Sequence, residues 1–190
     1  MIQRLLMLCG LSCAGKTLMG QHLQANLDFL HVEASDYMHY LFDAESEHDE
    51  TISQFALRKM ASDPIAIPRF ILGLTGSRWG SENNVVISGF RSPIEVQEMA
   101  ESLRTIRWTR TIYVQAAREV RFRRCAMRKR SRKDAEWSTF AIEDGRQCNM
   151  GVQDVRDQAG VITVHNEGTI QEYLRTVEGI LQDLDQRRVG

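Results

Sequence analysis

Short apolar runs alternate with amphipathic stretches along the chain. The first run, residues 4–9, is continuous and ends at Gly10, as is typical of a strand buried in a parallel sheet. Runs of this kind predict strands at residues 4–9, 29–32, 84–89, 106–114 and 161–165. Because helical patterns separate these runs, the sequence predicts an α/β protein with a parallel, doubly wound sheet.

The segments between the strands place apolar residues at helical spacing. Residues 37–78 show this spacing without a strong strand, and Pro93 marks the start of a later helix. A basic helix is predicted over 118–130, and another helix near Phe140. The last helix carries one apolar stripe, made of Ile170, Leu174, Val177, Leu181 and Leu184. With 190 residues, the chain is expected to form a single domain over 1–190.

Residues 10–17, Gly-Leu-Ser-Cys-Ala-Gly-Lys-Thr, match the phosphate-binding pattern G-x-x-x-x-G-K-[ST]. The match lies between a predicted strand and a predicted helix, which argues against chance. Gly10 and Gly15 permit backbone torsions that let amide N–H groups point at phosphate oxygens. Lys16 is expected to neutralise the β- and γ-phosphates of ATP, and Thr17 to bind Mg²⁺. The predicted nucleotide-binding residues here are Gly10, Ser12, Cys13, Ala14, Gly15, Lys16, Thr17 and Leu18.

Composition and hydropathy indicate what kind of protein carries this loop and where in the cell it is expected. No apolar run approaches the ~20 residues that a membrane helix needs, and no signal segment precedes the loop. The 4 cysteines have no Cys-x-x-Cys spacing, which argues against a zinc site or a disulfide framework. The sequence therefore predicts a reduced, cytoplasmic protein without membrane contact. Cys13 is expected to fill an unconstrained loop position, with redox sensitivity as the alternative.

A phosphate loop alone does not distinguish kinases from other nucleotide hydrolases. The chain lacks the Asn-Lys-x-Asp of GTPases, and residues 85–87 do not end in the adjacent acids typical of motors. Asp36 follows the second strand, where a carboxylate could accept a proton from a substrate hydroxyl or help to hold Mg²⁺. A helix N-cap is the structural alternative for Asp36. Arg91 follows the third strand and could clamp a phosphate, or lie in solvent at a helix start.

A basic segment extends over residues 118–133. It contains one acid, Glu119, and nine basic residues: Arg118, Arg121, Arg123, Arg124, Arg128, Lys129, Arg130, Arg132 and Lys133. On a helix, Arg121, Arg124 and Arg128 share one face, and arginines closing over a transferring phosphoryl group would stabilise its charge and exclude water. A solvated helix face and a nucleic-acid patch are the alternatives. Nucleic acid is disfavoured because few aromatic residues interleave and the net charge is −1.

Several motifs together carry a family resemblance. They are the loop at 10–17, the segment 85–96 with its Gly-Phe-Arg-Ser-Pro, the arginines from 121 to 130, residues 137–144, and His-Asn-Glu-Gly-Thr at 165–169. In these motifs the chain resembles P-loop kinases grouped around dephospho-CoA kinase, most closely an uncharacterised, largely archaeal kinase-like family. Nucleoside monophosphate kinases are neighbours of that group. The similarity covers nearly the whole chain.

The resemblance implies a three-layer P-loop fold with sheet order 2-3-1-4-5. It also implies a helical acceptor region near 37–80 and an arginine-rich lid near 128–137. Arg128 would be the lid arginine nearest the transferred phosphate. Independently of the resemblance, Arg124 is expected to bind the nucleotide, and Arg124 or Arg130 to help Arg128 stabilise the transferring group. Asn166 and Gly168 would lie beside the adenine. Asp144 and Arg146 match a pair in the related family that is either functional or a structural ion pair.

One residue departs from the family pattern. Ser88 stands where the third strand usually ends in Asp, and a hydroxyl cannot supply negative charge to a metal. Asp36 would then carry more of the Mg²⁺ binding, or the acceptor would differ, or catalysis would be weakened. The sequence predicts an ATP- and Mg²⁺-dependent kinase of a nucleotide-like small molecule, with Lys16, Asp36, Arg91 and Arg128 as catalytic residues and Thr17 and Asp36 as metal ligands. The alternative is an ATP-dependent regulatory or nucleic-acid-binding protein.

Overall fold

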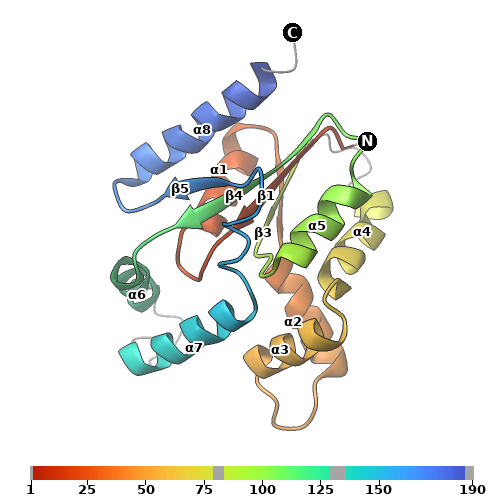
Figure 1. Ribbon diagram of the computed structural model, residues 1–190, viewed down its shortest axis with the longest axis vertical. Coiled ribbons are helices and arrows are strands. Elements are labelled where there is room, and N and C mark those ends of the chain that lie inside the picture. Colours follow the sequence, from red (N-terminus) through yellow and green to blue (C-terminus); the bar gives the residue numbers. More distant parts are fainter. Residues whose placement is uncertain (1, 79–83, 129–135, 187–190) are drawn as a thin grey trace.

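The structure is a computed structural model that describes residues 2–78, 84–128 and 136–186. Its strands are β1 (Arg4–Cys9), β2 (Leu30–Glu33), β3 (Asn84–Ser88), β4 (Trp108–Gln115) and β5 (Ile162–His165). Its helices are α1 (Lys16–Asn26), α2 (Ala34–Glu45), α3 (Ile52–Ser62), α4 (Ala66–Arg78), α5 (Pro93–Ser102), α6 (Arg118–Met127), α7 (Trp137–Asn149) and α8 (Ile170–Gln186). Each predicted strand is present, the first with its predicted ends and the others with ends that shift by one or two residues. Figure 1 shows the helices arranged around the strands.

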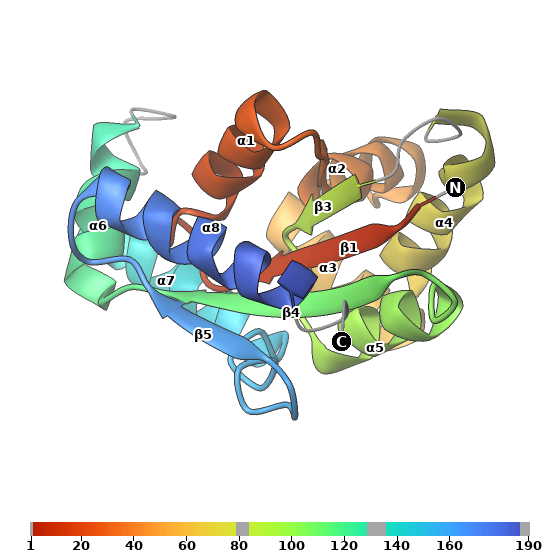
Figure 2. The same ribbon diagram turned by 90° about the horizontal axis from the view of Figure 1, so that it is seen from above.

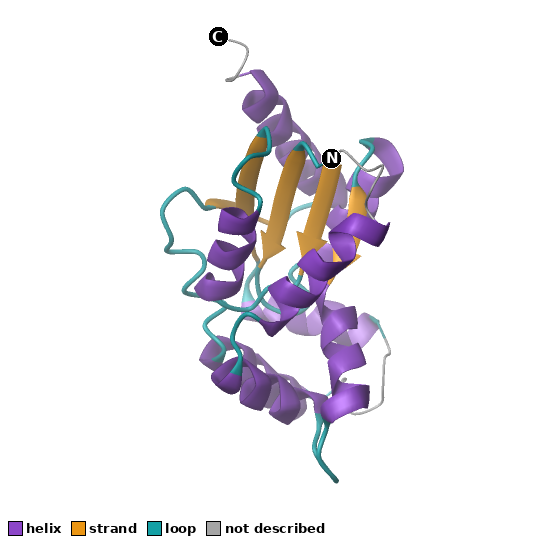
Figure 3. Cartoon of the chain, turned by 90° about the vertical axis from the view of Figure 1, so that its right-hand side faces the viewer, coloured by secondary structure: helices purple, strands orange, loops and turns teal. Residues whose placement is uncertain are grey.

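The five strands form one parallel sheet in the order β2-β3-β1-β4-β5, which confirms the predicted fold class and strand order. β1 lies in the centre, with Leu8 opposite Ser88 of β3 on one side and Ile112 of β4 on the other. All strands point the same way (Figure 3). Their carboxyl ends therefore meet at one edge, and the loops that follow them share that edge.

Successive side chains of β1 point to opposite faces of the sheet, so they pack into two separate hydrophobic clusters. Leu5 and Met7 pack into a cluster that includes side chains of α2, α3, α4 and α5. Leu6 and Leu8 pack into a second cluster, on the face covered by α1 and α8. Figure 2 shows these helix layers on opposite sides of the sheet. Burial on both faces explains why β1 is an uninterrupted apolar run.

The predicted acceptor region consists of helices α2, α3 and α4, in agreement with its helical periodicity. The basic helix ends at Met127 rather than at residue 130, and Arg128 is its C-cap. Residues 129–135, which include Arg130, Arg132 and most of the predicted lid, lie outside the described residues. Among the helices of the described ranges, none combines the length and the apolar character needed to cross a membrane.

Candidate nucleotide-binding site

The loop at residues 10–17 connects β1 to α1 and needs both of its glycines. Gly10 has φ 134° and Gly15 has φ 115°, values in the left-handed region that side chains disfavour. A Cβ at Gly10 would lie 2.4 Å from the carbonyl oxygen of Val114, and one at Gly15 would lie 2.3 Å from Nδ2 of Asn166. The predicted reason for these glycines, backbone freedom within a crowded loop, is confirmed.

Polar groups of the loop are engaged with protein partners in this conformation. Lys16 Nζ donates hydrogen bonds to the carbonyl oxygens of Gly10, at 2.7 Å, and Leu11, at 2.9 Å. The backbone N–H of Ser12 donates to Oε1 of Gln147 at 2.9 Å, and Gln147 Nε2 donates back to Ser12 Oγ. A phosphate bound by this loop would therefore replace Gln147 at the Ser12 amide.

Residues distant in sequence donate hydrogen bonds to backbone carbonyl oxygens of the loop. Asn166 is buried and donates from Nδ2 to the carbonyl oxygen of Ala14 at 2.7 Å, while Tyr173 donates from its hydroxyl to Gly15 at 3.3 Å. Arg124 Nη2 donates to Oδ1 of Asn166 at 3.3 Å. Asn166 and Arg124 thus come together at the donor loop. Their contacts support the backbone of that loop, and the adenine role assigned to Asn166 stays a prediction.

Gly168 and Leu18, two further predicted nucleotide-binding residues, lie at the edges of this arrangement. Gly168 is in the turn between β5 and α8, where a Cβ would come within 2.6 Å of Glu172 Oε2. Leu18 lies in the first turn of α1 and is half-buried. Their roles in nucleotide binding stay predictions.

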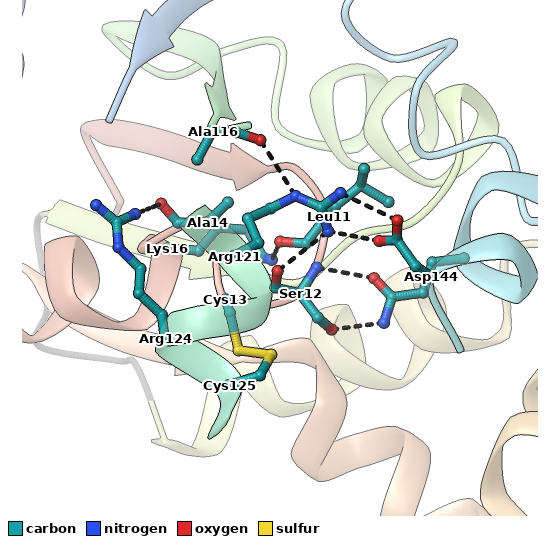
Figure 4. The surroundings of a disulfide bond; sticks show 11 residues. Leu11, Ser12, Cys13, Ala14, Lys16, Ala116, Arg121, Arg124, Cys125 and Asp144 are labelled. Carbon is teal, nitrogen blue, oxygen red and sulfur yellow. Dashed lines mark hydrogen bonds and ion pairs between the residues drawn. A yellow bond between two sulfur atoms is a disulfide. The ribbon is translucent and has the colours of Figure 1, made fainter. Parts of the chain in front are cut away.

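The state of the cysteines differs from the prediction. Cys13 and Cys125 form a disulfide between the phosphate loop and α6, with Cα atoms 5.8 Å apart (Figure 4). The expectation of unpaired cysteines was wrong because spacing rules detect only local motifs, whereas these two residues are 112 positions apart and meet through the fold. Cys9 and Cys148 are free. Cys13 is therefore not in an unconstrained position, and the cytoplasmic location stays a prediction.

The arginine face of α6 also differs from the prediction. Arg121 is buried and forms a bidentate ion pair with Asp144 of α7, at 2.5 and 3.0 Å, so its guanidinium already has a carboxylate partner (Figure 4). Arg118 adds a second ion pair to Asp144 at 3.1 Å. Arg146 pairs with Glu143 instead, so the predicted Asp144–Arg146 relation is not an ion pair. The pairing with Asp144 was not predicted because helical spacing cannot show which arginine meets a buried acid, and a role of Arg121 at the phosphate stays a prediction.

A cavity of about 350 Å³ joins the loop to the acceptor side. It is lined by Gly10, Ser12, Cys13, Lys16, Thr17, Glu33, Ser35, Asp36, His39, Gly89, Arg91, Arg128 and Gln147. The structure therefore brings the four predicted catalytic residues to one cavity, together with the predicted metal ligand Thr17. They come from the loop, from α2, from the connection between β3 and α5, and from the end of α6.

Arg91 and Asp36 face this cavity in different settings. Burial lowers the pKa of Arg91, although the charges of Glu95 and Glu143 oppose that shift. Among the described residues, its guanidinium makes one hydrogen-bond contact, from Nη1 to the sulfur of Met150 at 3.7 Å, which leaves donors for an anion. Asp36 is exposed and is the third residue of α2, so it is not the N-cap of that helix.

Sequence reasoning missed three features of the site. Gln147 binds Ser12, but a glutamine inside a helix gives no sequence signal for such a contact. His31 Nε2 lies 2.8 Å from Ser88 Oγ, a pairing set by the register of neighbouring strands. Glu33 lines the cavity from the end of β2, and its position one strand away from Ser88 could have suggested it.

Comparisons with known proteins agree with this fold. A family model described as AAA domain matches residues 6–149. A UPF0200 protein of Pyrobaculum aerophilum is 35% identical over 100 residues, which are 53% of this chain and 56% of that protein. A UPF0200 protein of Pyrococcus horikoshii is 30% identical over 100 residues, 53% of each chain. The chain thus spans about half the length of the curated relatives it matches.

Solved structures of low sequence identity share the fold over nearly their whole length. A gluconokinase from Sinorhizobium meliloti 1021 superimposes with a TM-score of 0.61 at 15% identity, covering 95% of this chain and 93% of that one. A sugar kinase from Janibacter sp. HTCC2649 gives 0.60 at 12% identity, with 96% and 95% covered. These likenesses establish the P-loop fold of small kinases. Because the family model matches well over half of the sequence, the chain belongs to the AAA domain family.

Proposed function

We propose that the protein is an ATP- and Mg²⁺-dependent phosphotransferase that acts on an anionic, nucleotide-like small molecule. One observation carries this proposal. The phosphate loop shares a single cavity with Asp36, Arg91 and Arg128, which come from three other segments of the chain. A protein that only bound a nucleotide would not need two arginines and a carboxylate across from its phosphate loop. The fold shared with a gluconokinase and a sugar kinase is compatible with this proposal.

The donor side fits a triphosphate. Gly10 and Gly15 have left-handed torsions at positions without room for a Cβ, and Lys16 begins α1 directly after the second of them. Lys16 would exchange its two carbonyl partners for phosphate oxygens, and the Thr17 hydroxyl would hold the metal. A bound Mg²⁺ would neutralise charge on the β- and γ-phosphates.

The acceptor side fits an anion. Arg91 presents a guanidinium that can hold a phosphate or a carboxylate in bidentate fashion. Arg128, at the end of α6, lines the cavity beside the phosphate loop and would stabilise charge on the transferring group. Helices α2, α3 and α4 would form the acceptor pocket. This arrangement supports placing the chain near the dephospho-CoA and nucleoside monophosphate kinases, as the motifs imply.

Asp36 separates two chemistries within this proposal. If the acceptor atom is a phosphate oxygen, as in a nucleoside monophosphate, no proton has to be removed and Asp36→Asn should cost little. If the acceptor is a hydroxyl, as in dephospho-CoA or gluconate, loss of this base should lower kcat about 10²–10⁴-fold. The kcat of Asp36→Asn therefore shows whether the acceptor atom is a phosphate oxygen or a hydroxyl oxygen.

The direct test is ADP formation from ATP and Mg²⁺ with a panel of acceptors. The panel contains dephospho-CoA, the nucleoside and deoxynucleoside monophosphates, and gluconate, with glucose as the uncharged comparison. Lys16→Met serves as the control for contaminating kinases. We expect turnover with at least one anionic acceptor, loss of that turnover in Lys16→Met, and a large rise in the acceptor KM in Arg91→Met.

The rival class is a regulatory or nucleic-acid-binding ATPase. No turnover with any acceptor, combined with ATP hydrolysis that nucleic acid stimulates and binding that weakens steeply with salt, would replace the kinase proposal by that one. The structure disfavours it, because Arg118 and Arg121 of the basic helix already pair with Asp144. Phe122 packs against Trp137 and Phe140 instead of presenting a free stacking face.

A further inference from the structure

Glu33 occupies a position that no motif assigned. It is the last residue of β2 and the N-cap of α2. In the parallel pairing of β2 with β3, it lies opposite Ser88. Its side chain lines the same cavity as Lys16 and Thr17. Glu33 therefore lies at the end of β2, beside the end of β3. There Ser88 has a hydroxyl in place of the carboxylate that the family pattern usually has.

One oxygen of the Glu33 carboxylate has no hydrogen bond within the described residues, and its ion pair with His31 is long. Oε1 is buried and accepts no hydrogen bond within the described part of the chain. Although Glu33 is an N-cap, its side chain does not accept from the amides of α2. His31 Nε2 lies 3.5 Å away, but the short contact of this nitrogen, at 2.8 Å, is with Ser88 Oγ. Lys16 is also committed elsewhere, to the carbonyl oxygens of its own loop.

A buried carboxylate oxygen that accepts no hydrogen bond is costly unless a bound ligand interacts with it. Its desolvation is not repaid by any hydrogen bond, so such a group in a native structure calls for a missing water or ion. Glu33 exerts the largest charge effect on Lys16, where its negative charge opposes the lowering of the lysine pKa by burial. The carboxylate is therefore electrostatically coupled to the place where the phosphates and their cation would lie.

Resting on the proposed function, we infer that Glu33 supplies the carboxylate that holds the Mg²⁺ of bound Mg·ATP, directly or through a water, in the role that Ser88 cannot perform. Magnesium is commonly held by one or two carboxylates together with phosphate oxygens. Among the described residues, no group of three or more His, Cys, Asp or Glu side chains could hold a metal by itself. The ion would accordingly bind with the nucleotide, through Thr17 and Glu33. Asp36, which is exposed, is left for the acceptor.

The test is the coupling between Mg²⁺ and ATP on the protein, which does not depend on turnover. Calorimetry gives the Kd for ATP in EDTA and in saturating MgCl₂, and the ratio of the two values is the coupling factor. We expect Glu33→Gln to reduce this factor about 10–100-fold, as removal of metal-supporting groups does. Binding in EDTA should be unchanged or tighter, because a negative charge beside the polyphosphate has been removed. A folding defect would instead weaken ATP binding under both conditions.

Two matched variants complete the design. Glu47→Gln makes the same chemical change on an exposed loop and should behave as wild type. Asp36→Asn removes the other carboxylate of the cavity and should change the coupling factor less than about threefold. Electron paramagnetic resonance with Mn²⁺ measures the ion directly, and by reciprocity its affinity for the ATP-loaded protein should fall by the same factor in Glu33→Gln.

The outcomes separate this inference from the function on which it rests. If wild-type protein does not bind ATP, both are overturned. If wild-type protein shows the Mg²⁺ coupling and Glu33→Gln retains it, the inference is overturned and the phosphotransferase proposal stands. Loss of coupling in Asp36→Asn with retention in Glu33→Gln would likewise overturn it, in favour of Asp36 as the metal ligand. A loss confined to Glu33→Gln supports it.

Discussion

The Cys13–Cys125 disulfide should contribute a large part of the stability of the fold. Replacing Cys125 by Ser removes the cross-link at its α6 end and leaves the phosphate loop chemically intact. The bond joins residues 112 positions apart. In the chain-entropy account, closing a loop of that length in the unfolded state is worth about 4–5 kcal/mol at 25 °C. Marginally stable domains have ~5–15 kcal/mol in total, so this is a substantial fraction.

Guanidinium unfolding of oxidised protein, followed by tryptophan fluorescence and circular dichroism, measures this contribution. With a slope of about 5 kcal/mol/M, Cys125→Ser should lower the midpoint by roughly 1 M. Reductant should produce the same shift in wild-type protein and no shift in the variant. Cys148→Ser, which alters a free cysteine of α7, is the matched control and should leave the midpoint within about 0.2 M of wild type.

The reasoning would be refuted by a wild-type midpoint that reductant does not move, accompanied by a loss below about 1 kcal/mol in Cys125→Ser. Such a result means that the two sulfurs are not bonded in solution, or that the unfolded chain already holds residues 13 and 125 close together. Counting free thiols in denatured protein before and after reduction separates these explanations. Four thiols before reduction indicate the first, and two indicate the second.

Three further predictions concern buried charge, backbone and pH. Asp144→Ala leaves the buried guanidinium of Arg121 without its partner and should cost about 3–5 kcal/mol of unfolding free energy, measured by denaturant titration; a loss below 1 kcal/mol would contradict the buried pair. Gly15→Ala should abolish ATP binding in calorimetry, because φ is 115° there, whereas Gly179→Ala within α8 should leave binding intact and stabilise the helix by about 0.5–1 kcal/mol. Burial lowers the pKa of Lys16 to about 8, and phosphate prefers the ammonium form, so the Kd for ATP should rise as pH rises from 7 through 9; a constant Kd would contradict this.

The fold was predictable because its central strands β1 and β3 are buried on both faces. The first run is apolar at every position after Arg4, and this pattern indicates a central parallel strand wherever it occurs. Strand order came from the family motifs and not from the pattern itself. Helix ends were predicted less well, since the basic run continues beyond Met127 and charge alone does not mark where a helix stops.

The residues of the candidate site were predictable where they come soon after a strand in the sequence. The phosphate loop, Asp36 and Arg91 each follow a strand, and the parallel sheet brings them together. Contacts between distant segments were not predictable. The disulfide to Cys125 and the support of the loop by Asn166 depend on how α6 and the turn after β5 pack, and no local pattern encodes that packing.

These distant contacts change the interpretation of the arginine-rich segment. Helix α6 is joined to the phosphate loop by the disulfide, to α7 by Arg121, and to the loop again by Arg124, whose Nη1 donates to the carbonyl oxygen of Ala14 at 3.5 Å. A helix held by three such contacts cannot swing as a lid without moving the loop itself. On the proposed function, Arg128, which is the C-cap of the same helix and lines the cavity beside the loop, would be a preset positive charge for the transferring phosphoryl group. Preset charge stabilises a transferring phosphoryl group without reorganisation, which is how electrostatic catalysis gains most of its effect.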